Sequence, residues 1–179
     1  MSAQRARSVI LSALLPMLLF LVTPARTYAQ EEIRWVNGLE QAINQAFIHN
    51  KHVLVYVRSD YCGFCKQLED RVLRQTEVVT AMNEHFVPVR FDAMNEEKIW
   101  FMGTQWEYRK TERVHELAYL LLDGDMRLPG WVVINKLGEV IAPIHGYMDA
   151  GTLQKVLLYY GSHAYIVTSW EEFQAKAAF

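Results

Sequence analysis

One short segment limits what this chain can fold into more than any other. An apolar, β-branched run, His52–Val57, is bounded by polar residues and is typical of a strand buried on both faces. Two cysteines, Cys62 and Cys65, follow after a short loop, and helical periodicity then continues to Leu73. The cysteine pair is therefore expected at the point where a buried strand passes into a helix.

That position gives the pair a specific chemistry. A thiolate at a helix N-terminus is stabilised by unpaired backbone N–H groups and by the helix dipole, which lower its pKa below the roughly 8.5 of a free thiol. We therefore predict that Cys62, at the helix tip, is the nucleophile, and that Cys65, one turn further and more buried, resolves the mixed disulfide. One helical turn brings the two sulfurs together, so a reversible Cys62–Cys65 disulfide is expected.

Three other uses of the cysteines compete with redox chemistry. A purely structural disulfide across so short a loop would remove little entropy from the unfolded chain. A zinc half-site needs two further ligands, and the only close histidine pair, His49 and His52, flanks a predicted helix–strand junction at an unusual spacing. Two unrelated free thiols would oxidise in an exported protein. Redox chemistry fits best, and neither a metal nor another cofactor is expected.

Residues 1–29 have the features of an export signal. Two arginines precede an apolar run, Val9–Val22, that is shorter than the ~20 residues of a comfortable membrane span. Small residues at Thr27 and Ala29 fit a signal-peptidase site, so we expect cleavage after residue 29 and an exported, periplasmic or extracytoplasmic protein. The alternative is an uncleaved membrane anchor formed by residues 9–22. Export would place the cysteines where disulfides can persist.

Length and charge exclude several classes of protein. A chain of 179 residues has room for one domain, and two cysteines cannot build a disulfide-rich scaffold. Removal of residues 1–29 takes away three arginines and no acidic residue, leaving 15 basic and 20 acidic residues. This acidic balance argues against a nucleic-acid partner. We expect a monomer.

Hydrophobic periodicity predicts the other elements of a mixed α/β sheet with helices on both faces. The expected helices are 39–49, 65–73, 76–85 with Thr76 as cap, 111–121, one from Asp149 or Thr152 to about 160, and a terminal helix opened by Ser169-Trp170-Glu171-Glu172. The expected strands are 52–57, 86–91, an inserted β-hairpin over 99–108, and a hairpin formed by 131–134 and 139–144. Residues 30–179 are expected to form one domain, with a core of about 35–160 and an extension over 161–179.

The arrangement resembles the thioredoxin fold. The resemblance rests on a strand followed by Cys62-Gly63-Phe64-Cys65-Lys66 and a helix, and then on Arg127-Leu128-Pro129, two strands joined by an Asn/Gly turn, and Gly146-Tyr147. It covers about residues 35–160, and within the superfamily it is closest to exported, single-domain SoxW-type thioredoxin-related proteins.

The resemblance implies further site residues. Pro129 is expected to be a cis-proline that faces the cysteine pair. Leu128 and Pro129, together with Gly63 and Phe64 between the cysteines, would contact the substrate. Lys66, which follows the second cysteine, and Tyr61, which precedes the first, are expected to support catalysis.

The chain also departs from the family pattern. Many thioredoxins carry a buried aspartate six residues before the first cysteine, where it assists removal of the proton from the resolving thiol. This chain has Tyr56 there, so Asp60, Glu69 or a water would have to serve. In addition, Tyr61 replaces the usual tryptophan, and Leu128 replaces the common threonine or valine before the proline.

The dipeptide between the cysteines bears on the direction of electron flow. Gly63-Phe64 contains no histidine or other cation, so we expect modest thiolate stabilisation, which favours a reductant over a strong oxidase. The expected substrates are disulfides of other exported proteins. A reductant in an oxidising compartment must be recharged, most simply by a membrane electron-transfer protein. An isomerase or an oxidase is the alternative enzyme.

A non-enzymatic binding module is the alternative from a different class. It would hold a partner in a groove around Cys62, Pro129 and the aromatic hairpin. The aromatic residues of that hairpin could line a substrate lip, although cross-strand pairing alone explains them and is the interpretation we favour. They are Trp100, Phe101, Trp106 and Tyr108.

Overall fold

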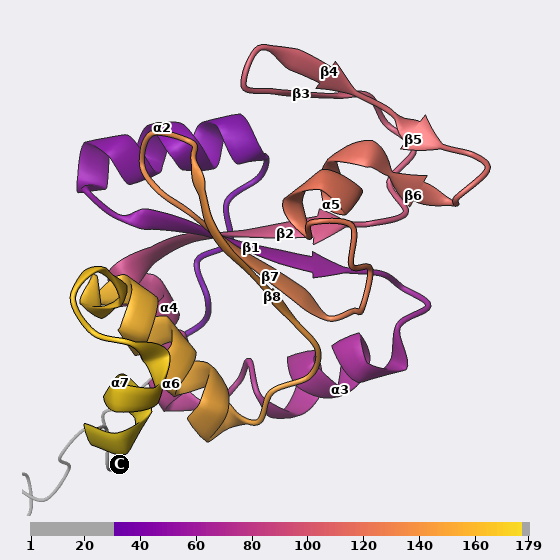
Figure 1. The fold of residues 1–179 in the computed structure, drawn as a ribbon. Helices are drawn as coiled ribbons and strands as arrows, with labels where there is room; N and C mark the ends of the chain where they lie inside the picture. The colour runs from indigo at the N-terminus through magenta and orange to yellow at the C-terminus, as the bar shows by residue number, and fades with distance from the viewer. Residues whose placement is uncertain (1–30, 177–179) are drawn as a thin grey trace, which may run out of the picture. The chain divides into compact units, whose positions relative to one another are not determined.

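A four-stranded mixed sheet in the order β2–β1–β7–β8 is the centre of the computed structural model (Figure 1). Its strands are β1 (His52–Arg58), β2 (Phe86–Asp92), β7 (Gly130–Ile134) and β8 (Val140–His145). β1 pairs parallel with β2 and antiparallel with β7, and β7 pairs antiparallel with β8. The structure describes residues 31–176, so the predicted signal peptide and its cleavage site lie outside the described residues.

The alternation of side chains along β1 builds two hydrophobic cores, one on each face of the sheet. Val53, Val55 and Val57 pack in one core with residues of α2 (Leu39–His49) and α5 (Glu116–Leu121). Leu54 and Tyr56 pack in the other. That core includes residues of three helices, α3 (Gly63–Arg71), α4 (Thr76–His85) and α6 (Ala150–Gly161). Figure 1 shows the two sets of helices on opposite faces, which confirms the predicted fold class.

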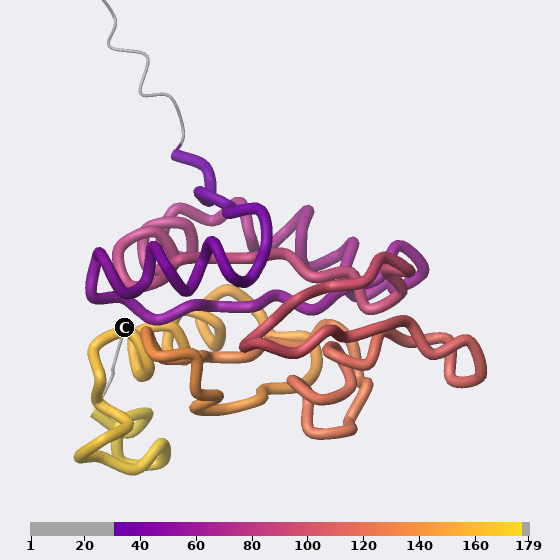
Figure 2. Tube along the Cα trace, turned by 90° about the horizontal axis from the view of Figure 1, so that it is seen from above, coloured from indigo at the N-terminus to yellow at the C-terminus, as the bar shows by residue number. Residues whose placement is uncertain are grey.

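The segment ahead of α2, residues 31–38, is called the lead segment and lies along the β2 edge of the sheet. Val36 forms a parallel bridge with Val89 of β2, and its N–H donates to the carbonyl of Pro88 at 2.8 Å. In Figure 2, which looks down on the α2 side, this segment and the orange β7–β8 hairpin occupy opposite margins. The lead therefore covers part of an edge that would otherwise be open to pairing with another chain.

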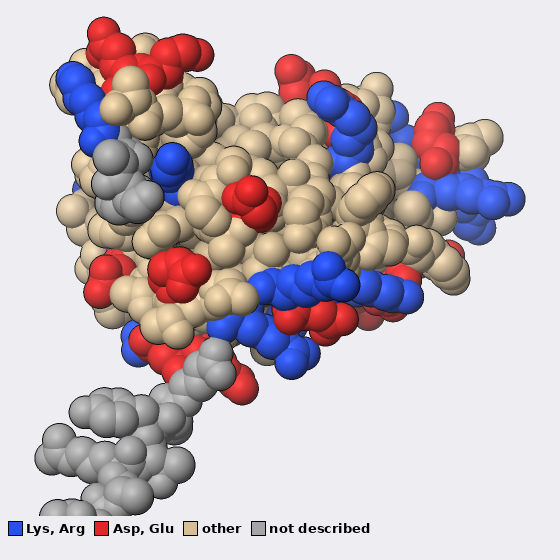
Figure 3. Space-filling model, turned by 90° about the horizontal axis from the view of Figure 1, so that it is seen from below, with Lys and Arg blue, Asp and Glu red and all other residues tan. Residues whose placement is uncertain are grey.

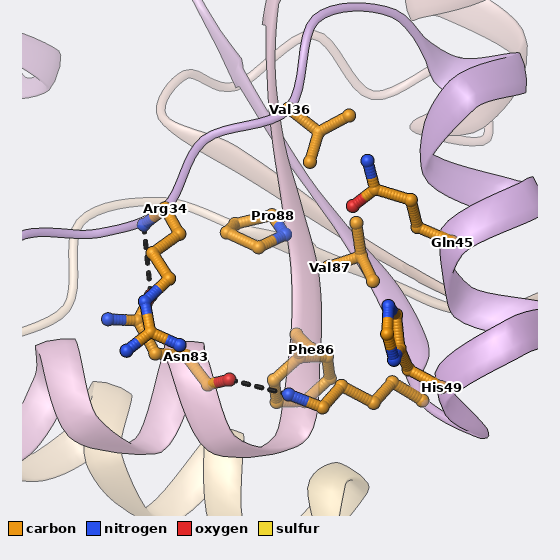
Figure 4. A pocket seen from close by; sticks show the side chains of 9 residues that line it. Arg34, Val36, Gln45, His49, Asn83, Phe86, Val87 and Pro88 are labelled. Atoms are coloured by element: carbon orange, nitrogen blue, oxygen red, sulfur yellow. Dashed lines mark hydrogen bonds between the residues drawn. The ribbon is translucent and has the colours of Figure 1, made fainter.

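Hydrogen bonds to Asn83 of α4 hold the lead segment at this edge of the sheet. The side-chain oxygen of Asn83 accepts a hydrogen bond from the backbone N–H of Arg34 at 2.9 Å, and its carbonyl accepts one from Lys51 Nζ at 2.7 Å (Figure 4). Its amide nitrogen donates to Glu31 Oε1 and to the carbonyl of Glu32. These groups border a cavity of about 290 Å³. Side-chain and backbone groups of Asn83 thus join α4 to the lead segment and to Lys51, which directly precedes β1.

The inserted hairpin predicted over 99–108 forms over a shorter range, from β3 (Ile99–Phe101) and β4 (Thr104–Trp106), and Tyr108 lies in the strand that follows the hairpin. Phe101 is buried in the core shared with α2, and Trp106 packs against that core and donates from Nε1 to the carbonyl of Phe101 at 3.3 Å. The hairpin lies on the opposite side of the sheet from α3 (Figure 1). These aromatic side chains anchor the hairpin and do not form a lip beside the cysteines.

The helix predicted over 111–121 is wrong in its first half. Val114–His115 forms a short strand, β6, that pairs with β5 (Tyr108–Arg109), and α5 begins only at Glu116. Arg113 adopts a left-handed conformation with φ of 55°, which interrupts a helix. The His115 side chain then caps α5, because its Nδ1 accepts from the N–H of Leu117 at 3.1 Å. Val114 reaches the core from the strand instead of from a helical turn.

Two other helix starts can be compared with prediction. Thr76 is not a cap: it is the first residue of α4, and Gln75 occupies the cap position, where its carbonyl accepts from the N–H groups of Val78 and Val79. The terminal helix α7 (Trp170–Lys176) forms as expected, with Ser169 Oγ accepting from the N–H of Glu172 at 3.2 Å. The serine half of the predicted capping box is therefore present.

A histidine pair ties the extension after α6 to the sheet. His52 Nε2, at the start of β1, lies 2.9 Å from His163 Nδ1, just before a 3₁₀ turn at Ala164–Ile166, and 3.4 Å from Tyr165 Oη. Burial, together with the nearby His163 and Lys136, lowers the pKa of His52 to about 4. His52 is therefore neutral at pH 7.

This pKa predicts a pH-dependent stability. The unfolded chain takes up a proton at His52 near pH 6.5 and the folded chain only near pH 4, so unfolding is favoured as the pH falls between these values. We expect the free energy of unfolding to decrease by about 2–3 kcal/mol from this residue across that window. Urea titrations at pH 4.5 and 7.5 should show a smaller difference for His52→Gln. His49→Gln, which removes an exposed histidine, should keep the wild-type difference, and equal differences in all three proteins would contradict the assignment.

Candidate redox site

The loop between β1 and α3 places Cys62 at the start of a helix. Ser59 is buried and accepts twice: its carbonyl from the N–H of Cys62 at 3.0 Å, and its hydroxyl from the N–H of Tyr61 at 3.2 Å. This tight turn reverses the chain directly after the strand. Cys62 is the N-cap of α3, and its carbonyl accepts from the N–H of Lys66 at 3.2 Å. The sequence thus converts a buried strand into a helix within four residues.

The two cysteines form a disulfide and differ in exposure. Cys62 and Cys65 are bonded, with their Cα atoms 5.2 Å apart, and Cys62 Sγ accepts from the N–H of Cys65 at 3.0 Å. Cys62 is partly exposed, whereas Cys65 is fully buried. The first turn of α3 carries no acidic side chain that would repel a thiolate. An attacking group can therefore reach Cys62 and not Cys65.

A second loop packs against the core that contains Cys65. The Leu128–Pro129 peptide bond is cis, and Pro129 is buried. Leu128 is partly buried and packs against the core that contains Cys65 as well as against the core on the opposite face. The carbonyl of Pro129 accepts from the N–H of Gly146 at 2.8 Å. Gly146 has φ of +93°, a conformation that favours glycine, so this residue type suits the turn that closes the loop.

The outer surface beside Cys62 is aromatic. Tyr61 and Phe64 are 91% and 62% exposed, and the Phe64 ring lies 6.3 Å from the ring of Tyr147. Gly63 and Lys66 are also exposed. On the side of the molecule where α3 lies, Figure 3 shows a broad uncharged area with acidic and basic groups interspersed around it. The immediate surroundings of Cys62 thus expose two aromatic rings together with the Lys66 cation.

A polar network lies beneath the cysteines, on the buried side of α3. Tyr56 is completely buried and stacks on Trp131, with ring centroids 4.6 Å apart. Its hydroxyl lies 3.4 Å from the carbonyl oxygen of Cys65 and 3.3 Å from Glu69 Oε1. Glu69 Oε1 is also 2.7 Å from Arg58 Nε. Tyr56, Glu69 and Arg58 therefore connect β1 with the helix that carries the cysteines.

The surroundings of Tyr56 determine whether its phenol is protonated. Burial raises the pKa of Tyr56 well above its usual range, and the carboxylate of Glu69 raises it further. Tyr56 keeps its proton at neutral pH and acts only as a hydrogen-bond donor. Sequence reasoning named Glu69 and Asp60 as candidate proton acceptors but missed that Tyr56 contacts both Glu69 and Cys65. The alternation of side chains along β1 could have indicated these contacts, because residues 54, 56 and 58 share the face toward α3.

Two further findings concern metals and membranes. Within residues 31–176, no three histidine, cysteine, aspartate or glutamate side chains come together in a way that could hold a metal ion. No helix in the same part of the chain has the length and apolar character needed to span a bilayer.

A model of the thioredoxin-like domain matches residues 39–161. The chain belongs to the thioredoxin-like family. No curated protein sequence matches it.

Solved structures agree on the fold. A thioredoxin-fold protein from Helicobacter pylori is 21% identical, with a TM-score of 0.54, over 72% of this chain and 80% of that one. A putative disulphide-isomerase from Bacteroides thetaiotaomicron is 23% identical, with a TM-score of 0.54, over 73% and 94%. A DsbH oxidoreductase is 17% identical, with a TM-score of 0.53, over 75% and 89%. The narrower SoxW-type resemblance stays a prediction.

The difference in exposure predicts unequal reactivity. After reduction, Cys62 should be alkylated by iodoacetamide well before Cys65, with a midpoint of the pH–rate profile below the roughly 8.5 of a free thiol. Peptide mapping by mass spectrometry would follow each residue. In urea the two cysteines should react alike, since the helix tip and the core are then lost. Equal rates in the folded protein would contradict the assignment of Cys62 as the exposed thiol.

Proposed function

We propose that this member of the thioredoxin-like family is a thiol–disulfide oxidoreductase that reduces disulfides in exported proteins. The observation that carries the proposal is the disulfide between a partly exposed Cys62, at the tip of α3, and a fully buried Cys65. A disulfide that only stabilised the fold would gain little from so short a loop. A nucleophile and a resolving thiol need this division into accessible and protected sulfurs.

The reaction proceeds in two exchanges. The Cys62 thiolate attacks one sulfur of the substrate disulfide and displaces the other sulfur as a thiolate, which leaves a mixed disulfide. The Cys65 thiolate then attacks Cys62 Sγ, breaks the bond to the substrate and releases the second substrate thiolate. The substrate gains two electrons, and the Cys62–Cys65 disulfide forms.

We propose substrate contact at four residues beside the cysteines. Gly63 and Phe64 are exposed on one side of Cys62, and Leu128 and Pro129 lie in the loop packed against the cysteine core. Tyr61 and Lys66 flank the pair and support it. The aromatic, uncharged character of Phe64 favours an unfolded or extended substrate segment with apolar side chains over a highly charged one.

The direction of electron flow rests on the absence of a cation between the cysteines. Gly63 and Phe64 add no charge that would stabilise the Cys62 thiolate further, so the disulfide is a weak oxidant and the dithiol is a useful reductant. The proposal includes export of a monomer, and a membrane electron-transfer protein that reduces Cys62–Cys65 after each turnover. A measured potential near the roughly −120 mV of strong oxidases would contradict this direction.

An insulin-reduction assay tests the activity. With dithiothreitol as the electron source, the wild-type protein should accelerate precipitation of the insulin B chain, and Cys62→Ser should abolish the acceleration because no nucleophile remains. Cys65→Ser should stop after one exchange and retain a mixed disulfide with its substrate, detectable by mass.

The matched control is Asp70→Asn, at an exposed position of α3, which leaves the cysteine loop and both sulfurs unchanged. It should keep cysteine-dependent turnover. A non-enzymatic binding module predicts a different outcome: insulin reduction no faster with wild type than with Cys62→Ser, which would contradict the proposal.

A further inference from the structure

A second pocket lies at the end of the sheet away from the cysteines. Its cavity of about 370 Å³ is lined by the start of β1, the turn between β7 and β8, and the extension after α6. β1 runs for seven residues from His52, about 20 Å at the rise of a strand, and Cys62 follows its far end (Figure 1). The redox chemistry of the cysteines therefore does not use this pocket.

Three polar rings from two distant parts of the chain line the pocket. His52 Nε2 lies 2.9 Å from His163 Nδ1 and 3.4 Å from Tyr165 Oη. His52 is only 6% exposed, and its other ring nitrogen, Nδ1, is buried without a hydrogen-bond partner among the described residues. His163 adopts a left-handed conformation with φ of 61°, which is uncommon outside glycine and occurs often at ligand sites. The fold thus gathers hydrogen-bonding rings here and leaves part of their capacity unused.

The charge that borders the pocket is of one sign. Two lysines, Lys51 and Lys136, are among its nine described lining residues, and none of the nine is acidic. The Lys51 ammonium is held by the carbonyl of Asn83 at 2.7 Å. The Lys136 ammonium donates to the neutral side chain of Asn50 at 2.7 Å, and an ammonium has three donors. Lys136 can therefore bind an anion while it keeps its bond to Asn50.

A metal cation is the wrong occupant for these surroundings. Two imidazole nitrogens are close enough to share an ion, but a buried cation also needs compensating negative charge. The carboxylate of Glu139 accepts from Asn135 Nδ2 at 2.7 Å and is not among the residues that line the pocket. The ammonium of Lys136 would repel a second cation. The electrostatics favour an anion.

Apolar side chains complete the lining. Leu137, in the turn between β7 and β8, is 59% exposed, and Ile166, at the end of the 3₁₀ turn, is 68% exposed. A cavity of 300–1,000 Å³ with apolar walls and a few convergent polar groups is typical of small-molecule sites. An occupant in contact with Leu137 and Ile166 would remove apolar surface from water. The pocket thus combines a cationic group with an apolar wall.

We propose that this pocket binds a carboxylate attached to an apolar body. The carboxylate accepts hydrogen bonds from Lys136 Nζ and from the Tyr165 hydroxyl, and the apolar body packs against Leu137 and Ile166. Small organic acids carry this chemistry, and so does the C-terminus of a peptide that ends in an apolar residue. The site does not depend on the proposed redox function, so each can fail without the other.

Isothermal titration calorimetry of the disulfide form tests the proposal with matched probes. Octanoate carries both features, octanamide lacks the charge, and acetate lacks the apolar body. Octanoate should bind with a stoichiometry of one, and octanamide and acetate should bind at least about 10-fold more weakly, because each loses one set of contacts. Acetyl-Ala-Leu with a free C-terminus tests the second source of this chemistry. Whichever of octanoate and the peptide binds more tightly identifies the source, and both results support the site.

Variants locate the site. Lys136→Gln keeps a donor for Asn50 but removes the charge, so it should weaken octanoate about 10-fold and leave octanamide unchanged. The matched control is Lys110→Gln, between β5 and β6 and outside the pocket, which should bind octanoate like the wild type. In NMR spectra, octanoate should shift the imidazole signals of His52 and His163 and leave those of the exposed His49 in place.

Four results would overturn the proposal. They are absence of octanoate binding at millimolar concentration, equal affinity of wild type and Lys136→Gln, and octanamide binding as tight as that of octanoate, which would indicate an apolar pocket without anion recognition. The fourth is loss of octanoate binding in Cys62→Ser, which would place the acid at the aromatic surface beside the cysteines. Wild-type affinity in Cys62→Ser, with weakening confined to Lys136→Gln, supports the carboxylate site.

Discussion

The burial of β1 on both faces is the constraint on which the structure depends. Each residue of a strand must point to one face or the other, so a seven-residue strand with apolar side chains on both faces needs a separate layer of helices on each side. Val53, Val55 and Val57 meet α2 and α5, while Leu54 and Tyr56 meet α3, α4 and α6. Neighbouring strands β2 and β7 protect both edges of β1.

The same strand positions the candidate redox site. The turn at Ser59 follows directly after this strand. Backbone hydrogen bonds in the turn and in the first turn of α3 hold Cys62 at the helix tip. Tyr56 stacks on Trp131 of β7 directly beneath the cysteine helix. The phenolic hydroxyl is the polar atom of Tyr56 that reaches α3, where it lies near the Cys65 carbonyl and Glu69. A single buried side chain thus supports the helix and contacts both the carbonyl oxygen of Cys65 and Glu69 Oε1.

Much of the fold was predictable because it is encoded locally. The run His52–Val57 and the helix 39–49 follow from local pattern, and the alternation of side chains over 99–108 favoured the hairpin that forms over 99–106. The start of α5 was not predictable in this way. The apolar spacing from Val114 is helical, yet Arg113 adopts a left-handed conformation and Val114 pairs with β5, because the strand lets Val114 reach the same core. Tertiary burial overrides local periodicity when both arrangements bury the same side chain.

The sequence by itself determined the placement of two cysteines at a strand–helix junction, because spacing and hydrophobic pattern are local properties. It also showed that Tyr56 stands where many related proteins carry an acid. Only the tertiary structure decided which groups that tyrosine contacts. Tyr56 and Glu69 are thirteen residues apart on different elements, and their contact exists because β1 and α3 pack face to face. Such a contact depends on the angle and height at which a helix crosses a strand, which no local pattern specifies.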